Sequence, residues 1–368
     1  MIIERLSIIN YKNIEQAELS FSDKINCFIG SNGMGKTNAL DAIYYLSFCK
    51  SHTNPIDSQV VRHGEEMFML QGLFRTDDGE REQISCGLKA GRRKSFKRNG
   101  KDYRRLTEHI GLIPAVLISP SDTTLVVGGS EERRRFVDTV ISQYNINYLD
   151  ALIRYGRALQ QRNNLLKEEA EPDPDMMDIY EEAMAATGEQ IYAERKQFVR
   201  QLQPIFQEMY CHIAQSPEKV SLTYSSHCER GPLTEQLRMG RSKERIVGYT
   251  LHGIHKDDLI MELNGFPLKK EGSQGQCKTY LVALKLAQFV LLKQTGRKQT
   301  PLLLLDDVFD KLDSRRVEQI VRLAKDENFG QIFMTDTNRE HLDRILLQTD
   351  CDYKLFSVNK GNIVDETQ

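Results

Sequence analysis

The sequence lacks the features of a secreted or membrane-spanning protein. No apolar run is long enough to cross a bilayer, and residues 1–5 carry an acid rather than the start of a signal peptide. The seven cysteines are scattered and odd in number, with no C-x-x-C pair. This usage favours reduced thiols over a disulfide framework or a zinc site. We therefore expect a cytoplasmic protein without membrane contacts.

The chain also lacks an excess of charge of either sign. Its 50 Lys and Arg residues face 52 Asp and Glu residues, so the formal net charge is -2. Without a global basic field, any contact with nucleic acid must come from a local basic patch. The 368 residues predict two or three domains, and we find no internal repeat or low-complexity tract.

What the sequence does contain is a P-loop. Residues 30–37 match G-x-x-x-x-G-K-[ST] at every fixed position. The apolar stretch at 25–29 predicts a buried strand before the loop, and Leu40, Ile43 and Leu46 have helical spacing after it. We expect the loop amides and the helix N-terminus to surround the phosphates of ATP. The predicted nucleotide contacts are Gly30, Ser31, Asn32, Gly33, Met34, Gly35, Lys36 and Thr37.

A second half of this site is expected at residues 302–307. Four consecutive leucines predict a strand buried on both faces, and two carboxylates follow it. Asp306 is placed to hold Mg²⁺ together with Thr37. Lys36 would reach the β- and γ-phosphates, and Asp307 would orient or deprotonate the attacking water. Lys36 and Asp307 are therefore the candidate catalytic residues.

The two halves of the site lie roughly 270 residues apart, and a helical region interrupts the α/β pattern between them. We predict an α/β P-loop ATPase head with a mixed sheet, formed by residues 1–125 and 250–368. A mainly helical lobe, residues 126–249, is inserted into it. Within the lobe, Pro204 should kink or restart a long helix.

The most basic segment of the chain is residues 89–105. Asn99-Gly100 predicts a hairpin turn at its centre. A ribbon with a basic face can follow a DNA backbone. The open alternative is a solvated hairpin whose charges only prevent edge-to-edge pairing. The candidate DNA contacts are Arg92, Arg93, Lys94, Lys97 and Arg98.

A His-Asp-Asp run at residues 255–258 suggests metal ligands at first sight. Its spacing fits no zinc pattern. We expect a structural or phosphate-sensing role for it instead.

Several motifs together resemble the ABC-type ATPase heads of the SMC and Rad-fifty class. They are the P-loop, residues 273–276 (Ser-Gln-Gly-Gln), the Asp306-Asp307 strand end and Leu312-Asp313. The resemblance is closest to the RecF family of bacterial recombination mediators, which have similar runs at 6–13, 133–138, 161–167 and 253–259. The chain departs from the expected patterns at Ser121, Ile254, Lys256, Asp307 and residues 335–337.

The resemblance implies that two heads dimerise around two ATP molecules. Ser273, Gln274, Gly275 and Gln276 would contact the γ-phosphate held by the partner subunit, so ATP drives formation of a homodimer. Because Asp307 is one methylene shorter than the Glu of the broader class, we expect weak, slow ATP hydrolysis that acts as a switch.

The resemblance further implies a role in DNA repair, replication and SOS induction. The DNA would be double-stranded or a single-strand/duplex junction, contacted through the basic hairpin and the Arg-rich run at 133–135. RecR would be the direct partner, with RecO and RecA downstream, and the ATPase would be stimulated by DNA. The alternative from the P-loop alone is a small-molecule kinase or a transporter-type ATPase that does not act on DNA.

Overall fold

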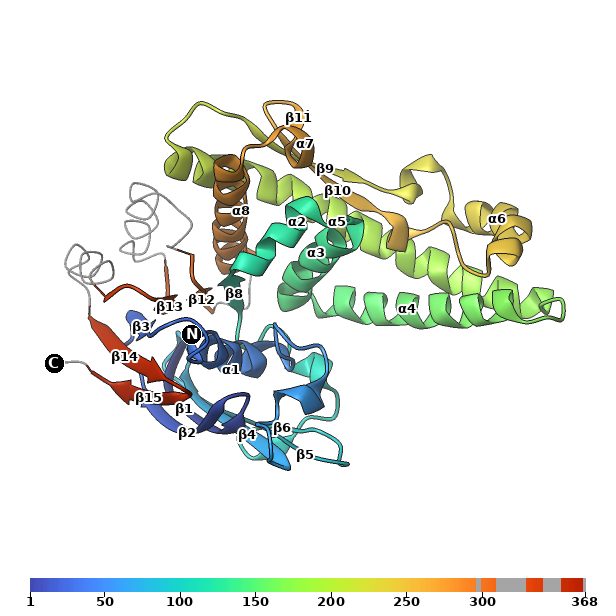
Figure 1. The fold of residues 1–368 in the computed structure, drawn as a ribbon. Helices are drawn as coiled ribbons and strands as arrows, with labels where there is room; N and C mark the ends of the chain where they lie inside the picture. Colours follow the sequence, from blue (N-terminus) through green and yellow to red (C-terminus); the bar gives the residue numbers. More distant parts are fainter. Residues whose placement is uncertain (296–298, 309–328, 340–351, 367–368) are drawn as a thin grey trace. The chain divides into compact units, whose positions relative to one another are not determined.

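The structure is a computed structural model that describes residues 1–295, 299–308, 329–339 and 352–366 (Figure 1). The chain divides into two compact units. The head unit comprises Met1–Asp122, Met209–Gln215 and Lys278–Gln368, and the lobe unit comprises Thr123–Glu208 and Ser216–Cys277. Residues 250–277 thus lie in the lobe unit and not, as the sequence suggested, in the head. The reason is that the strand at 258–263 pairs with the strand at 220–225.

One sheet of the head unit is mostly parallel. Its six strands run in the order β15-β14-β3-β13-β12-β8, and only the β14–β15 hairpin is antiparallel. The strands are β3 (Ile25–Ile29), β8 (Ala115–Ile118), β12 (Leu302–Leu305), β13 (Ile332–Asp336), β14 (Tyr353–Asn359) and β15 (Asn362–Asp365). All four leucines of β12 are buried, as the uninterrupted apolar run predicted.

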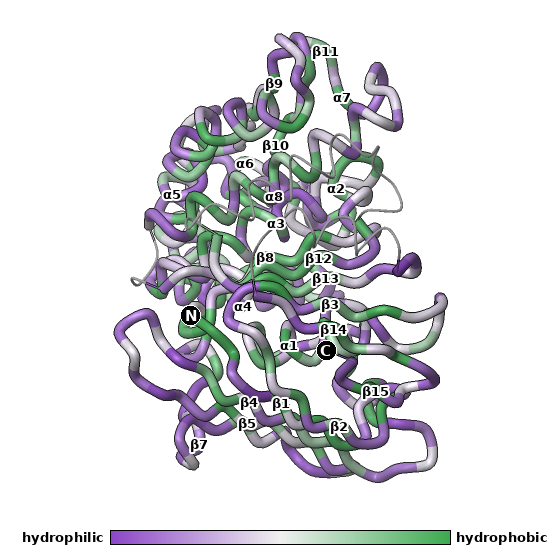
Figure 2. The backbone as a smooth tube through the Cα atoms, turned by 90° about the vertical axis from the view of Figure 1, so that its left-hand side faces the viewer, coloured by the Kyte–Doolittle hydropathy of each residue, from purple (hydrophilic) through white to green (hydrophobic). Residues whose placement is uncertain are grey.

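The second sheet of the head unit is antiparallel, in the order β2-β1-β4-β5-β6-β7. Its strands are β1 (Ile2–Tyr11), β2 (Ile14–Ser20), β4 (Met67–Arg75), β5 (Arg81–Lys89), β6 (Ser95–Arg98) and β7 (Lys101–Asp102). Helix α1 (Lys36–Phe48) contacts strands of both sheets, and side chains from all three layers form one apolar core. Figure 2 shows the contrast between the apolar strands β8 and β12 and the hydrophilic tip at β7.

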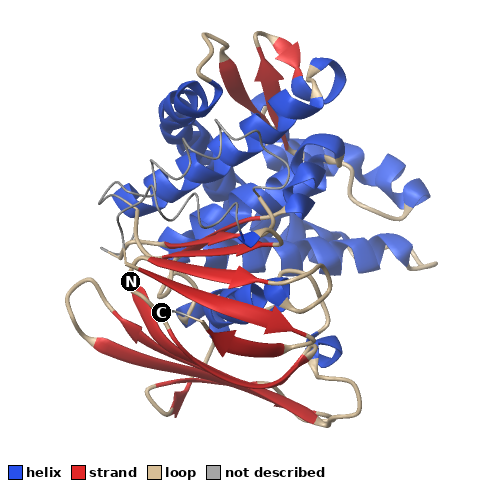
Figure 3. Cartoon of the chain, turned by 60° about the vertical axis from the view of Figure 1, so that its left-hand side comes forward, coloured by secondary structure: helices blue, strands red, loops and turns tan. Residues whose placement is uncertain are grey.

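The lobe unit is mainly helical, with one small sheet of order β11-β10-β9 (Figure 3). Its elements are α2 (Thr124–Val127), α3 (Ser130–Tyr144), α4 (Ile146–Lys167), β9 (Val220–Ser225), α6 (Leu233–Val247), β10 (Asp258–Leu263), β11 (Phe266–Pro267) and α7 (Leu268–Glu271). Two long helices, α5 (Pro174–Ala214) and α8 (Gln274–Thr295), belong partly to each unit.

The predicted restart at Pro204 does not occur. Helix α5 is continuous over its 41 residues, with Pro204 inside it. A proline removes only one backbone donor from such a long ladder. The glutamine side chains on either side of Pro204 form hydrogen bonds with backbone groups of another segment. Gln203 contacts Val220 and Leu222 in this way, and Gln207 contacts Val220 and Glu218. These bonds hold strand β9 along the helix.

The mixed α/β head with an inserted, mainly helical lobe is the fold that the sequence predicted. Both Asn-Gly turns are confirmed, with positive φ at Asn99, Gly100, Asn264 and Gly265, as a type I′ hairpin turn requires. No described helix is long and apolar enough to cross a membrane. Leu312-Asp313, the helix expected after them to about residue 325, and the helix stop expected at Gly296 lie outside the described residues.

Candidate nucleotide site

The P-loop connects β3 to α1, and its glycines are there for steric reasons. A Cβ on Gly30 would lie 2.3 Å from the carbonyl oxygen of Val358 in β14. A Cβ on Gly35 would lie 2.6 Å from Oδ1 of Asn13, and Gly35 has φ +114°. Only glycine fits such close backbone approaches and left-handed conformations. Gly30 and Gly35 are therefore required by their surroundings in the fold.

Two asparagines brace this loop from the side. Asn13 donates from Nδ2 to the carbonyl oxygen of Met34 at 3.0 Å, and Asn38 donates to Oδ1 of Asn13 at 2.8 Å. The backbone N–H of Gly361, in the β14–β15 turn, also donates to Met34 at 2.8 Å. The bracing by Asn38 and Gly361 was not predicted from the sequence, since it depends on segments that meet only in the fold.

Lys36 contacts the P-loop itself, and Thr37 contacts the carboxylate that follows β12. The buried Lys36 ammonium donates to the carbonyl oxygens of Gly30 at 2.7 Å and Ser31 at 3.3 Å. The Thr37 hydroxyl donates to Oδ1 of Asp306 at 2.9 Å. The structure thus brings the P-loop and the end of β12 together, as the motifs indicated.

The carboxylates after β12 are held by hydroxyl and amide groups. Thr335 at the end of β13 donates to Oδ1 of Asp306 at 3.0 Å and accepts the N–H of Asp307 at 2.9 Å. Burial raises the pKa of Asp306 above its usual range, against the hydrogen bonds from Thr37 and Thr335. Within the described ranges, no Lys or Arg forms an ion pair with Asp306 or Asp307.

A divalent cation fits this arrangement. Mg²⁺ is usually held by one or two protein oxygens, with water and phosphate oxygens completing the octahedron. Thr37 and Asp306 offer that pair of oxygens. The described residues contain no cluster of three or more His, Cys, Asp or Glu that suits a metal held by protein alone.

A pocket of about 560 Å³ lies beside the P-loop. Asn13 and Asn38, which brace the loop, also form part of its wall. The other lining residues are Lys12, Thr53, Asn54, Gln59, Val61, Arg62 and His63. This pocket is large enough for the part of a nucleotide that extends beyond the phosphates.

The Ser273 stretch forms the N-terminus of α8 in the lobe unit. Ser273 Oγ accepts the N–H of Gln276 at 3.2 Å, and Gln276 Oε1 accepts the N–H of Ser273 at 2.9 Å. This reciprocal pair is a capping box. Ser273 and Gln274 are exposed, while Gly275 and Gln276 are half-buried. The stretch is thus a preformed helix start at the surface.

The basic hairpin keeps fewer accessible cations than the sequence suggested. Lys94 turns inward, where its ammonium lies 2.7 Å from Asp57 and donates to the carbonyl oxygen of Cys49 at 2.6 Å. Arg98 binds both carboxylate oxygens of Glu82. Arg92 and Arg93 are exposed. Lys94 is therefore not placed for DNA contact, contrary to expectation.

Lys97, the remaining candidate, shares a surface with the two exposed arginines. It is half-buried and lies 3.8 Å from Asp102. Together with Arg92 and Arg93 it lines a hollow of about 360 Å³ on the outer face of β4 and β5. These three cations form what we call the hairpin rim.

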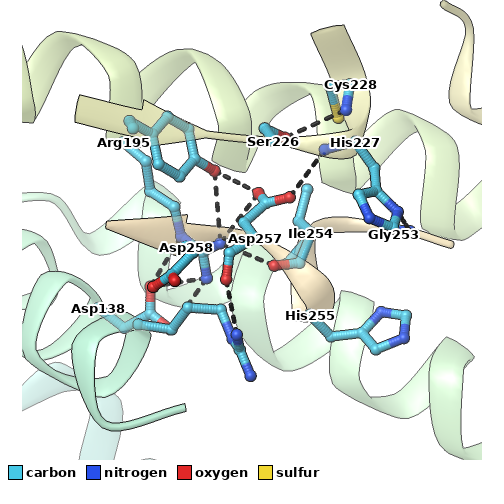
Figure 4. Close-up of polar contacts among 12 residues, drawn as sticks. Asp138, Arg195, Ser226, His227, Cys228, Gly253, Ile254, His255, Asp257 and Asp258 are labelled. Carbon is cyan, nitrogen blue, oxygen red and sulfur yellow. Dashed lines mark hydrogen bonds and ion pairs between the residues drawn. The ribbon is translucent and has the colours of Figure 1, made fainter. Parts of the chain in front are cut away.

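The Arg-rich run and the His-Asp-Asp run meet each other inside the lobe unit. Figure 4 shows His255, Asp257 and Asp258 of the second run. Arg133 binds both carboxylate oxygens of Asp258, at 2.7 and 3.0 Å, and Arg134 donates to the carbonyl oxygen of Asp257 at 2.6 Å. Burial lowers the pKa of His255 to about 4. The structural role expected for the His-Asp-Asp run is thus supported, and Arg133 and Arg134 are not available to DNA.

Comparisons with known proteins agree with this geometry. The family model described as the RecF/RecN/SMC N terminal domain matches residues 2–362. A DNA replication and repair protein RecF of Phocaeicola vulgatus is 58% identical over 368 residues, which is 100% of this chain and 99% of the relative. The chain belongs to the RecF family.

Solved structures extend this family assignment to the fold. A structure described as the recombination mediator protein RecF-ATP in the RecFOR pathway has a TM-score of 0.89 at 28% identity, covering 100% of this chain and 98% of that one. An Smc head domain derived from Pyrococcus furiosus has a TM-score of 0.58 at 18% identity, covering 100% of this chain and 96% of that one. The ABC-type head predicted from the motifs is confirmed.

Proposed function

We propose that this chain is an ATP-dependent, DNA-binding recombination mediator that uses slow ATP hydrolysis as a switch. The observation that carries the proposal is the contact between Thr37 and Asp306, because it joins the P-loop to a carboxylate that forms no ion pair with a Lys or Arg of the described residues. The RecF-ATP structure, which shares this fold over the full chain, adds support.

Each residue of the site would have its own role in binding or hydrolysing ATP. Lys36 would exchange its two carbonyl partners for the β- and γ-phosphate oxygens. Thr37 and Asp306 would hold Mg²⁺, which neutralises charge on the phosphates when it is bound. Asp307 would orient the attacking water, and its short side chain would keep the turnover low.

A second copy of the chain would complete the site. The exposed capping box at Ser273 and Gln276 presents a helix N-terminus to solvent, and such an end attracts a phosphate. We assign Ser273, Gln274, Gly275 and Gln276 to the γ-phosphate bound by the partner subunit. ATP binding would then favour the dimer, and hydrolysis would release it.

The proposed cellular role follows the relatives. The P. vulgatus relative is named a DNA replication and repair protein, and the RecF-ATP structure belongs to the RecFOR pathway. We infer cytoplasmic action on duplex DNA or on single-strand/duplex junctions, with RecR as partner and RecO and RecA downstream. Stimulation of the ATPase by DNA and a contribution to SOS induction belong to the same proposal.

Light scattering with and without ATP-Mg²⁺ tests the dimer. We expect the wild type to dimerise only with ATP, and Ser273→Arg to bind ATP but stay monomeric. Ser242→Arg, an equal change at an exposed position of α6, is the control and should dimerise. Dimers of Ser273→Arg would refute the contact in trans, and hydrolysis without any dimer or DNA response would favour a small-molecule P-loop enzyme.

The hairpin rim is our candidate DNA contact. Neutralising Arg92, Arg93 and Lys97 should reduce the slope of log K against log salt by about 0.9 for each lost phosphate contact. Lys24→Ala, at an exposed lysine elsewhere in the head unit, is the control. A slope equal to that of the wild type would place the DNA surface elsewhere.

A further inference from the structure

We propose that His52 is a positioning residue for ATP hydrolysis, because it holds the hydroxyls of Ser119 and Ser121 at the sheet edge beside Asp306. The inference rests on the proposed function and adds to it a hydroxyl pair that binds the attacking water. In the hydrolysis step the water oxygen bonds to the γ-phosphorus and the bond to the β-phosphate oxygen breaks. That oxygen keeps the electron pair and leaves with ADP, and the water proton passes to the Asp307 carboxylate.

The sheet places Ser119 next to the nucleotide site. Strand β8 is the parallel neighbour of β12, with Ile118 opposite Leu305, and the N–H of Asp306 donates to the carbonyl oxygen of Ile118 at 2.8 Å. Neighbouring strands lie about 4.8 Å apart. Ser119 therefore follows β8 at the level where Asp306 follows β12. It flanks Asp306 on the side opposite to β13 and Thr335 (Figure 1).

His52 reaches this edge because the chain folds back along α1 after the helix ends. The His52 N–H donates to Oδ1 of Asp41 at 2.7 Å, and Asp41 lies about one turn after Thr37. The imidazole packs edge-on against the ring of Tyr44, with centroids 5.2 Å apart. Its position is thus set by the same helix that carries the P-loop residues.

The imidazole and the two hydroxyls form one small cluster. His52 Nε2 lies 3.1 Å from Ser121 Oγ and 3.4 Å from Ser119 Oγ, and the hydroxyl oxygens are 2.7 Å apart. The turn itself is fixed by Asp122, which accepts the N–H of Ser119 at 2.8 Å and pairs with Lys285 at 2.7 Å. Such locked geometry is what a water-orienting group requires.

Burial favours the neutral form of the ring. Burial and the nearby Lys285 lower the pKa of His52, Lys12 acts in the same direction, and Asp122 and Asp41 oppose them. A neutral imidazole has one donor and one acceptor, so it can fix the direction of a hydroxyl without adding charge beside the phosphates.

Steady-state ATP hydrolysis by the full chain tests the proposal. We expect His52→Ala to lower kcat about tenfold, with KM for ATP within about twofold of wild type, since only transition-state positioning is lost. His52→Gln should recover most of kcat, because its amide can donate to the same hydroxyl. Ser121→Ala should lower kcat like His52→Ala, and His212→Ala, at an exposed histidine of the head unit, should not.

Three results would overturn the proposal. The first is an unchanged kcat in His52→Ala. The second is a loss in His52→Ala that His52→Gln does not restore, or that comes with a lower melting temperature, because both indicate a purely structural role. The third is a failure of the wild type to bind or hydrolyse ATP at all, which would refute the proposed function itself.

Discussion

The Asp306-Asp307 pair of the head unit and the Asp257-Asp258 pair of the lobe unit lie in opposite electrostatic surroundings. In the lobe, Arg133 binds Asp258, while Arg195 lies 3.4 Å from the Asp257 carboxylate. In the head, Asp306 and Asp307 receive hydrogen bonds from threonine hydroxyls instead. Two acids that look alike in the sequence thus stand in different electrostatic surroundings.

This difference separates a structural cluster from a binding site. A buried charge is tolerated when opposite charges and hydrogen bonds compensate it, as Arg195 does for Asp138 and Asp257. The buried Asp306 lacks such a partner among the described residues, while burial raises its pKa as it raises that of Asp257. A cation that binds there from solution therefore stabilises the carboxylate more than it would stabilise an acid that already has a counter-charge. Compensated acids therefore indicate packing, and uncompensated acids indicate a ligand.

Replacing Lys36 should have the largest effect on function. We expect Lys36→Ala to abolish measurable ATP binding, a loss of about 100-fold or more, because charged hydrogen bonds to phosphate contribute about 1.5–3 kcal/mol. Isothermal titration calorimetry measures the loss, and Lys24→Ala is the control. The melting temperature should stay close to that of the wild type, since the hydrogen bonds of the Lys36 ammonium within the described residues go to two loop carbonyls. Retained ATP affinity would refute the nucleotide site.

Removing the cation from the lobe cluster should instead affect stability. Arg195 is buried, and its Nε and Nη2 donate to the two oxygens of Asp138 at 3.0 and 3.1 Å. Arg195→Met leaves Asp138 and Asp257 without compensation, so we expect the free energy of unfolding to fall by about 3–5 kcal/mol. Urea denaturation measures this, and ATP binding by the folded fraction should persist.

A matched control separates this effect from the loss of any arginine. Arg135 is exposed and pairs with Glu131 and Glu132 on the same helix. Arg135→Met should change the unfolding free energy by less than about 0.5 kcal/mol. Equal losses in the two variants would mean that the Arg195 cluster is no more important to the fold than a surface ion pair.

Local patterns explain what the sequence could predict. The P-loop glycines, the leucine run of β12 and the two Asn-Gly turns are each determined by a few neighbouring residues, so they were found directly. The contact between Thr37 and Asp306 was also foreseeable, because both residues belong to motifs with known partners.

Contacts between distant segments explain what was missed. Nothing near Lys94 in the sequence shows that Asp57 draws it inward, and nothing near Gly361 shows that its N–H binds the P-loop. The extent of the lobe was misjudged for the same reason, since β9 and β10 pair although 32 residues, 226–257, separate them in the chain. Pairings of this kind carry no local periodicity.

Neutralising Asp306 gives the smallest expected change, but it tests the comparison most directly. An Asn at this position keeps an oxygen that accepts the hydrogen bonds from Thr37 and Thr335. It removes the negative charge, which has no ion-pair partner among the described residues. Since burial raises the folded-state pKa of Asp306, its ionisation destabilises the folded protein as the pH rises from about 4 towards 7. Without nucleotide and with EDTA, Asp306→Asn should therefore be more stable than wild type at pH 7, by about 1 kcal/mol, and equally stable near pH 4.

ATP-Mg²⁺ should reverse that order. The wild type should gain stability on binding through mass action, while Asp306→Asn should gain less and should not hydrolyse ATP. Melting temperatures at pH 4 and 7, each with EDTA or with ATP-Mg²⁺, provide the measurement, and Asp78→Asn at an exposed turn is the control. If Asp306→Asn were less stable than wild type without nucleotide, the carboxylate would be structural like those of the lobe. The two Asp-Asp pairs would then have different hydrogen-bond and ion-pair partners but the same structural role.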